Sequence, residues 1–305
     1  MKNSRFIITL LAVIVCASCS KNEAPPKEDE LPAPVETWKE HWFEHEQLVK
    51  RVYYDNSIAI YYDDDVLSTI EWPFTFVKDV WEYSKSVYGA MNGEDGDPRL
   101  YAIFHTGKYS GGHPAYYYDE SHDYRNVIDC GSSSQDAWET GQGNDLDIVT
   151  HEIGHIVEST TFGTQKSPSF PIWKDSKWAE IYIYDVYKGL GMNADAQRWH
   201  DLMMNNSDDF PKENTHWFKN WFYPIYSQYG ESKVLANYFK ILSENFPRDN
   251  SGAYTRDLNW GEFIHFWSGA ASVDLTDQAK SAFGWNDEWE NQLAKAKLDF
   301  PEVTY

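Results

Sequence analysis

The sequence has few cysteines and few basic residues. Of its 305 residues 3 are cysteine, and Cys16 and Cys19 lie close to the N-terminus, so Cys130 stands alone in the remainder. A single thiol cannot form an internal disulfide or a cysteine-based zinc site, and we expect Cys130 to be a small buried side chain. The 26 Lys and Arg against 48 Asp and Glu give a net charge of −22. A chain without a basic stripe is a poor partner for nucleic acid, so none is expected.

Long apolar runs are also missing, apart from one near the start. Residues 6–15 form an apolar run that follows Lys2 and Arg5; these ten residues are too few for a membrane-spanning helix but match the apolar core of a signal peptide. Small residues then precede Cys19, and the segment 15–19 resembles the signal of bacterial lipoproteins. The resemblance implies cleavage before Cys19, acylation of that residue and a lipid anchor in the bacterial cell envelope.

No internal repeat is visible, and composition divides the chain into three parts. Residues 1–18 are expected to be the signal peptide. Residues 19–36 are rich in Pro, Glu and Lys, which is typical of a disordered tether. Residues 37–305 are expected to form one domain with two lobes, 37–160 and 161–305.

Short segments rich in β-branched and aromatic residues predict strands, and helical spacing of apolar residues predicts helices. The expected strands are 57–62, 100–105, 115–119 and 126–130, and the expected helices of this half are 38–52 and 74–91. From residue 145 onward the chain is expected to be mostly helical. We therefore expect an α+β fold, in which a small, mostly antiparallel N-terminal sheet packs on the first of these later helices and a helical C-terminal lobe follows.

Aromatic residues make up 17% of the chain and include 14 Trp. We expect most of these rings to lie in the core. A minority would be available on surfaces that contact sugars or peptides.

The most informative motif is the sequence His-Glu-Ile-Gly-His at 151–155. On a helix His151 and His155 are one turn apart and project from one face, so their imidazoles can bind one zinc ion. Glu152 lies beside them, where it can take a proton from a water that the metal polarises. An apolar stripe at helical spacing would hold the opposite face in the core; it consists of Leu146, Val149, Ile153, Ile156 and Val157.

A catalytic zinc site usually takes a third protein ligand. Glu158 follows His155 by only three residues, and we expect it to be a solvated carboxylate at the helix end. The favoured candidate is Glu180, on a second helix that begins at Asp175 or Ser176. If Glu180 is not the ligand, Asp175 and Asp185 are the next candidates.

These two motifs resemble those of the gluzincin zinc metallopeptidases, especially the basic-secretory-protein and enhancin-like bacterial surface members. His155 is followed 25 residues later by Glu180, the last residue of a Trp-Ala-Glu sequence. The resemblance implies one zinc ion per chain, bound by His151, His155 and Glu180, with Glu152 as the catalytic base. The aminopeptidase sequence Gly-Ala-Met-Glu-Asn is missing, so an endopeptidase is expected.

The chain departs from the family pattern after Glu180. Ile181 replaces a common glycine, and Tyr184 stands where a carboxylate that orients a ligand is common; Asp185 follows it. We therefore regard Asp185 as the candidate for orienting His151 or His155.

Two further segments allow more than one interpretation. Residues 111–116 form either a strand along the substrate cleft, as the family resemblance implies, or a hairpin with a glycine turn. His41 and His45 are four residues apart without a glutamate between them, and a solvated helix face is favoured over a second metal site.

Two functions of different classes follow. The favoured one is a membrane-anchored zinc metallopeptidase that hydrolyses peptide bonds of extracellular proteins or glycoproteins. The alternative is a surface lipoprotein without catalytic activity, which binds glycan or peptide and whose zinc site is structural or vestigial. Glu152 argues against the alternative, because a structural zinc site has no use for a base.

Overall fold

The computed structural model describes residues 31–92 and 96–305. The segment expected to be a signal peptide, Cys19 and the expected tether up to residue 30 therefore lie outside the described residues. Residues 33–305 form one compact unit. In the part of the chain that the structure describes, no helix is both long and apolar enough to span a bilayer.

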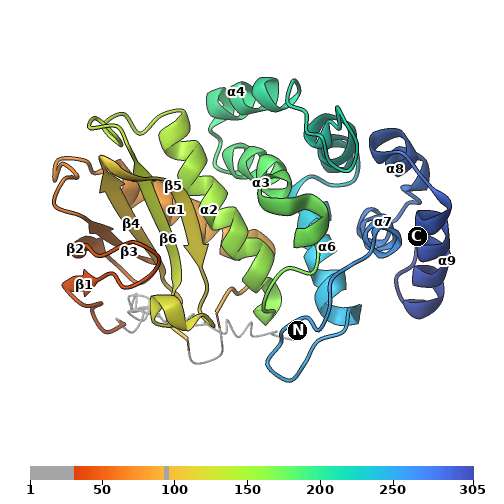
Figure 1. Cartoon of the computed structure of the whole chain (residues 1–305), viewed down its shortest axis with the longest axis horizontal. Helices are drawn as coiled ribbons and strands as arrows, with labels where there is room; N and C mark the ends of the chain where they lie inside the picture. Colours follow the sequence, from red (N-terminus) through yellow and green to blue (C-terminus); the bar gives the residue numbers. More distant parts are fainter. Residues whose placement is uncertain (1–30, 93–95) are drawn as a thin grey trace, which may run out of the picture. The chain divides into compact units, whose positions relative to one another are not determined.

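One mixed sheet of six strands occupies the N-terminal half (Figure 1). Its strands are β1 (Thr37–Lys39), β2 (Leu48–Tyr54), β3 (Ile58–Tyr62), β4 (Leu100–Thr106), β5 (Lys108–Ala115) and β6 (Asn126–Ser132). The spatial order is β1-β2-β3-β4-β6-β5. Strand β4 runs parallel to β3 and β6, and the other three pairings are antiparallel. The α+β class and the mostly antiparallel sheet are confirmed.

Helices dominate the rest of the chain. They are α1 (Trp72–Tyr88), α2 (Asn144–Thr160), α3 (Phe170–Gly189), α4 (Asn193–Met203), α5 (Tyr223–Gln228), α6 (Ser232–Asn245), α7 (Trp260–Ala271), α8 (Thr276–Phe283) and α9 (Asp287–Asp299). Figure 1 shows α2 between the sheet and the later helices. This helix therefore contacts both halves of the domain.

Side chains of the central strands alternate between two buried faces, as the period of a strand requires. On β4, Ala102 and Phe104 belong to the large core that also contains α1 and α2. Tyr101 and Ile103 join a smaller apolar cluster on the opposite face. Cys130 of β6 is buried in the large core, as expected, and burial raises the pKa of its thiol.

The smaller cluster shows why the helix expected at 38–52 is wrong. Residues 38–52 do not form a helix: Trp38 of β1 pairs with Val49 of β2, and both are buried against the sheet. This cross-strand packing overrides the local helical pattern. The strand expected at 115–119 is also wrong, because β5 runs from Lys108 to Ala115 and only Ala115 of the expected range belongs to it.

The aromatic residues of the C-terminal half mostly fill the core, as expected. The ring of Tyr238 in α6 stacks on that of Trp267 in α7 with centroids 4.1 Å apart. Trp173 and Trp178 of α3 are stacked at 5.7 Å and fully buried. These large rings join α3, α6 and α7 into one packed layer.

The turn between β1 and β2 allows a test of its packing with two neighbouring residues. Trp42 is 3% exposed and Phe43 is 76% exposed. Trp42→Ala should lower the free energy of unfolding by about 3–5 kcal/mol. Phe43→Ala should change it by less than about 0.5 kcal/mol. Urea denaturation measures both, and equally small effects would contradict the packing of this turn on the sheet.

Candidate metal centre

Helix α2 is held in place by its apolar stripe. Leu146, Val149, Ile153, Ile156 and Val157 are all buried in the large core, as the helical spacing predicts. The helix packs on β5 and β6 on one side and on α3 on the other. Packing on both sides fixes the rotation of the helix and hence the direction of its polar residues.

The two histidines of α2 meet as expected. His151 Nε2 lies 3.1 Å from His155 Nε2. Burial, together with the nearby charge of His155, lowers the pKa of His151 to about 4. Burial also favours the neutral form of His155, but the hydrogen bond and negative charge of Glu158 outweigh it and raise that pKa to about 9. Two such nitrogens side by side can bind one metal ion.

Glu158 does not lie in solvent, and that prediction is wrong. Its side chain is 2% exposed, and its Oε1 lies 3.2 Å from His155 Nδ1. A carboxylate that accepts a hydrogen bond from Nδ1 fixes the imidazole tautomer and leaves Nε2 free to bind a metal. Glu158 therefore orients His155, which is the role expected of Asp185.

Asp185 contacts tyrosines instead. It is fully buried, and its Oδ2 accepts a hydrogen bond of 2.6 Å from the Tyr88 hydroxyl. Burial raises the pKa of Asp185 to about 6, although hydrogen bonds from Tyr88, Tyr83 and Tyr226 oppose the shift. These contacts join α3 to α1 and α5.

Glu152 lies directly against strand β5. Its side chain is buried, and burial raises its pKa to about 7. A Cβ atom on Gly112 would lie only 2.6 Å from Glu152 Oε1, so the close approach of helix and strand requires glycine at this position. Residues 108–115 form an edge strand of the described sheet, which agrees with the strand interpretation of 111–116.

The structure brings Asp175 to the histidine pair. Asp175 Oδ1 lies 3.5 Å from His155 Nε2. His151, His155 and Asp175 each offer one ligand atom, and these atoms lie within 4.8 Å of one another. Helix α3 starts at Phe170, earlier than expected, and has a break at Lys174, whose φ of 52° is left-handed. The helix expected from Asp175 or Ser176 is the part that follows this break.

Glu180 has other partners. It is 5% exposed, and its Oε1 accepts hydrogen bonds from Lys177 Nζ at 2.9 Å and from Asn206 Nδ2 at 3.0 Å. The ammonium of Lys177 balances its charge. We therefore favour Asp175 as the third ligand, and the assignment to Glu180 stays the alternative prediction.

A pocket of about 420 Å³ has Glu158, the residue that contacts His155, in its wall. Its wall includes the rings of Tyr116, Tyr118 and Phe170. The rings of Tyr116 and Tyr118 are stacked with centroids 5.3 Å apart, and Phe170 is 44% exposed. The pocket is thus aromatic and open to solvent.

Two features of this site do not follow from the sequence pattern, and a third was not favoured by it. The position of Glu158 near a helix end predicts a solvent-exposed side chain, and only tertiary packing buries it. The role of Gly112 depends on an approach of strand and helix that sequence spacing does not show. As a zinc ligand, Asp175 is a less favoured candidate than Glu180, although the sequence predicts that it lies at the start of a helix.

The sequence matches no protein-family model and shows no significant similarity to a curated protein.

The third ligand can be identified by two matched substitutions on α3. Asp175→Asn should weaken zinc binding by more than about 100-fold, because it removes a ligand and not merely an outer contact. Glu180→Gln should leave zinc binding within about threefold, since Lys177 and Asn206 already satisfy that carboxylate. Competition with a chromogenic chelator measures both affinities. The opposite ranking would assign the ligand to Glu180.

Proposed function

We propose that this protein is a zinc-dependent metallopeptidase of the cell envelope that hydrolyses peptide bonds of extracellular proteins or glycoproteins. One observation carries the proposal. Two imidazole nitrogens 3.1 Å apart lie on the same helix as a buried carboxylate that faces an edge strand. The resemblance of the motif to gluzincins supports the same conclusion.

The residues present fit a zinc ion. Two histidine nitrogens and one carboxylate oxygen form a three-ligand set that leaves a fourth position open. Asp175 is 83% exposed at its side chain, so this side of the site is accessible from solvent. A zinc ion bound here would act as a Lewis acid that polarises a water and a peptide carbonyl.

Glu152 is the proton carrier of this mechanism. A carboxylate with a pKa near 7 can both accept and return a proton at neutral pH. Glu152 accepts the proton of the attacking water and then gives it to the departing amine. Its position against Gly112 keeps the carboxylate at the strand where the scissile bond would lie.

Strand β5 and the aromatic pocket would hold the substrate. An edge strand has unpaired backbone groups, so an extended peptide can pair with it as an additional strand. The pocket beside Glu158 would receive an apolar side chain or a sugar ring on its tyrosines and Phe170. Both features favour cleavage within a chain, as in an endopeptidase.

The proposed location depends on the N-terminal sequence. Cleavage before Cys19 and acylation of that residue would anchor the protein in the envelope. The acidic segment after Cys19 would then separate the catalytic domain from the membrane.

The substitution Glu152→Gln separates catalysis from zinc binding. It removes the base while keeping nearly the same shape, so hydrolysis should fall by about 10²–10⁴-fold. The zinc content should stay unchanged, because Glu152 is not a ligand. The measurement is cleavage of a panel of unfolded proteins and mucin-type glycoproteins, followed by mass spectrometry.

Glu288→Gln provides the control, because Glu288 is an exposed residue of α9 far along the chain from the site. It should leave hydrolysis unchanged. If the zinc-loaded protein cleaves nothing in the panel, the account is contradicted in favour of a binding protein without catalytic activity.

A further inference from the structure

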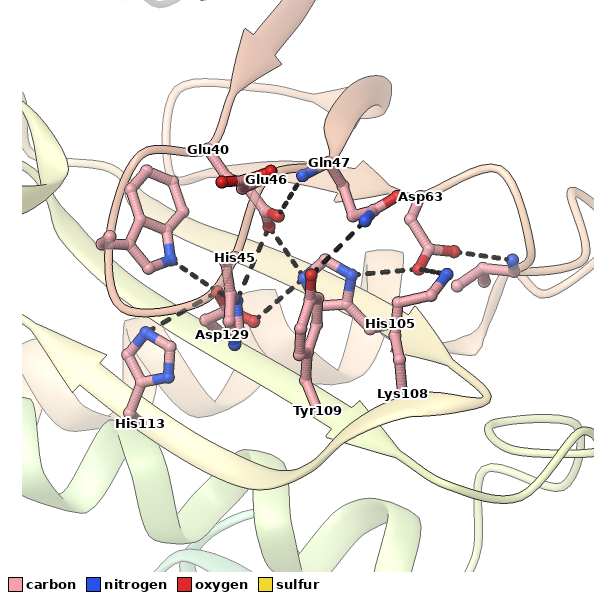
Figure 2. Close-up of polar contacts among 12 residues, drawn as sticks. Glu40, His45, Glu46, Gln47, Asp63, His105, Lys108, Tyr109, His113 and Asp129 are labelled. Atoms are coloured by element: carbon pink, nitrogen blue, oxygen red, sulfur yellow. Dashed lines mark hydrogen bonds and ion pairs between the residues drawn. The ribbon is translucent and has the colours of Figure 1, made fainter.

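A second group of histidines and carboxylates lies on the other face of the sheet (Figure 2). His105 of β4 and Asp129 of β6 belong to the face that carries Tyr101, Ile103 and Val127, opposite α2. Glu40 and His45 come from the turn between β1 and β2, which covers this face. We call these four residues the rear cluster.

The ligand atoms of the rear cluster converge. His105 Nε2 lies 2.8 Å from Glu40 Oε1 and 3.1 Å from Asp129 Oδ1. His45 Nδ1 lies 2.9 Å from Asp129 Oδ2 and 3.9 Å from Glu40 Oε1. Ligand atoms of a tetrahedral zinc ion are separated by about 3.3 Å, as bond lengths of about 2.0–2.1 Å require. The observed spacings bracket this value.

Three buried atoms of the rear cluster have only one another as close polar partners. Within residues 31–92 and 96–305, Glu40 Oε1, His105 Nε2 and Asp129 Oδ1 have no hydrogen-bond partner of ordinary geometry. Buried polar atoms are almost always paired, so three that point at one another call for an explanation. One cation among them would satisfy all three.

Surrounding contacts hold these side chains in place. His105 Nδ1 lies 3.0 Å from Asp63 Oδ2, which turns Nε2 toward Glu40 and Asp129. The Gln47 backbone N–H donates to Glu40 Oε2 at 2.9 Å, and Trp42 Nε1 donates to Asp129 Oδ2 at 2.9 Å. Carboxylates and an imidazole fixed by outer hydrogen bonds are characteristic of metal sites.

Charge favours a divalent ion. Glu40, Asp63 and Asp129 are buried carboxylates. The ammonium of Lys108 lies near them, with Nζ 3.0 Å from Asp63 Oδ2. Asp65 also pairs with Lys108, but it is an exposed residue. Three carboxylates and one ammonium carry two net negative charges, and buried charges need compensation, which a divalent ion would supply in place of protons on His45 and His105.

We propose that Glu40, His45, His105 and Asp129 form a second metal site, which binds zinc. Two imidazoles and two carboxylates suit zinc better than magnesium or calcium, which prefer oxygen ligands alone. Four protein ligands leave no position for substrate, so the site is structural. The ion joins the turn 40–47 to strands β4 and β6.

A route for the ion is present. A cavity of about 190 Å³ is lined by Phe43, Tyr109 and His113 and reaches His45 and Asp129. His113 Nε2 lies 3.6 Å from Asp129 Oδ2, so a further imidazole is within reach of an entering ion. This site does not depend on the proposed peptidase activity.

The test removes the first site and counts the zinc that remains. In the His151→Ala/His155→Ala variant, inductively coupled plasma mass spectrometry after incubation with zinc and gel filtration should find about one zinc per chain. Adding His105→Gln to that variant should abolish the remaining zinc. Adding His41→Gln should not, because His41 lies in the same turn but its side chain is 49% exposed.

Glu40→Gln is the second variant, in case His105→Gln does not fold; it should also lose the zinc. Circular dichroism verifies folding of each protein. A folded His151→Ala/His155→Ala protein that retains no zinc would overturn the proposal. The histidines of the rear cluster would then be protonated, and their positive charges would balance the carboxylates.

Discussion

The contact of helix α2 with strands β5 and β6 determines the geometry of the proposed active site. The apolar stripe of α2 is buried, so the helix cannot rotate without exposing it. The fixed orientation of α2 about its axis places His151, Glu152 and His155 together on the polar side of the helix. Gly112 allows the strand to approach Glu152 at a distance that any side chain would prevent. The peptidase proposal therefore depends on a packing interface as much as on its polar residues.

The sheet separates two groups of buried polar residues. Cys130 and Asp129 are neighbours in β6, yet the thiol faces α2 and the carboxylate faces the turn 40–47, because strand side chains alternate. On each face a histidine is held by a carboxylate at Nδ1: Glu158 holds His155, and Asp63 holds His105. The same arrangement of imidazole and carboxylate thus occurs twice, on elements distant in sequence. On both faces this contact turns the other imidazole nitrogen toward the proposed metal position.

Much of the fold could be predicted from local patterns. The strands near 58–62, 100–106 and 126–132 follow from β-branched and aromatic residues, and α2 follows from the spacing of its apolar stripe. The turn 40–47 could not be predicted. Its burial depends on Trp38 and Trp42 joining an apolar cluster that includes residues of β4 and β6, which lie far along the chain.

The candidate site, like the fold, could be predicted only where it depends on local patterns. The spacing of His151 and His155 on one helix is a local property, and the structure agrees with it. The environments of Glu158 and Asp175 depend on the position of α3 and on the break at Lys174, which no local pattern indicates. His105 had no nearby partner in the sequence, and only the fold brings it to Glu40 and His45.

Anomalous diffraction at the zinc absorption edge tests the central claim most directly. Crystals grown with zinc should give an anomalous peak about 2.0–2.2 Å from the Nε2 atoms of His151 and His155 and from a carboxylate oxygen of Asp175. A map without a peak at the histidine pair, from crystals in which both side chains are ordered, would contradict the account.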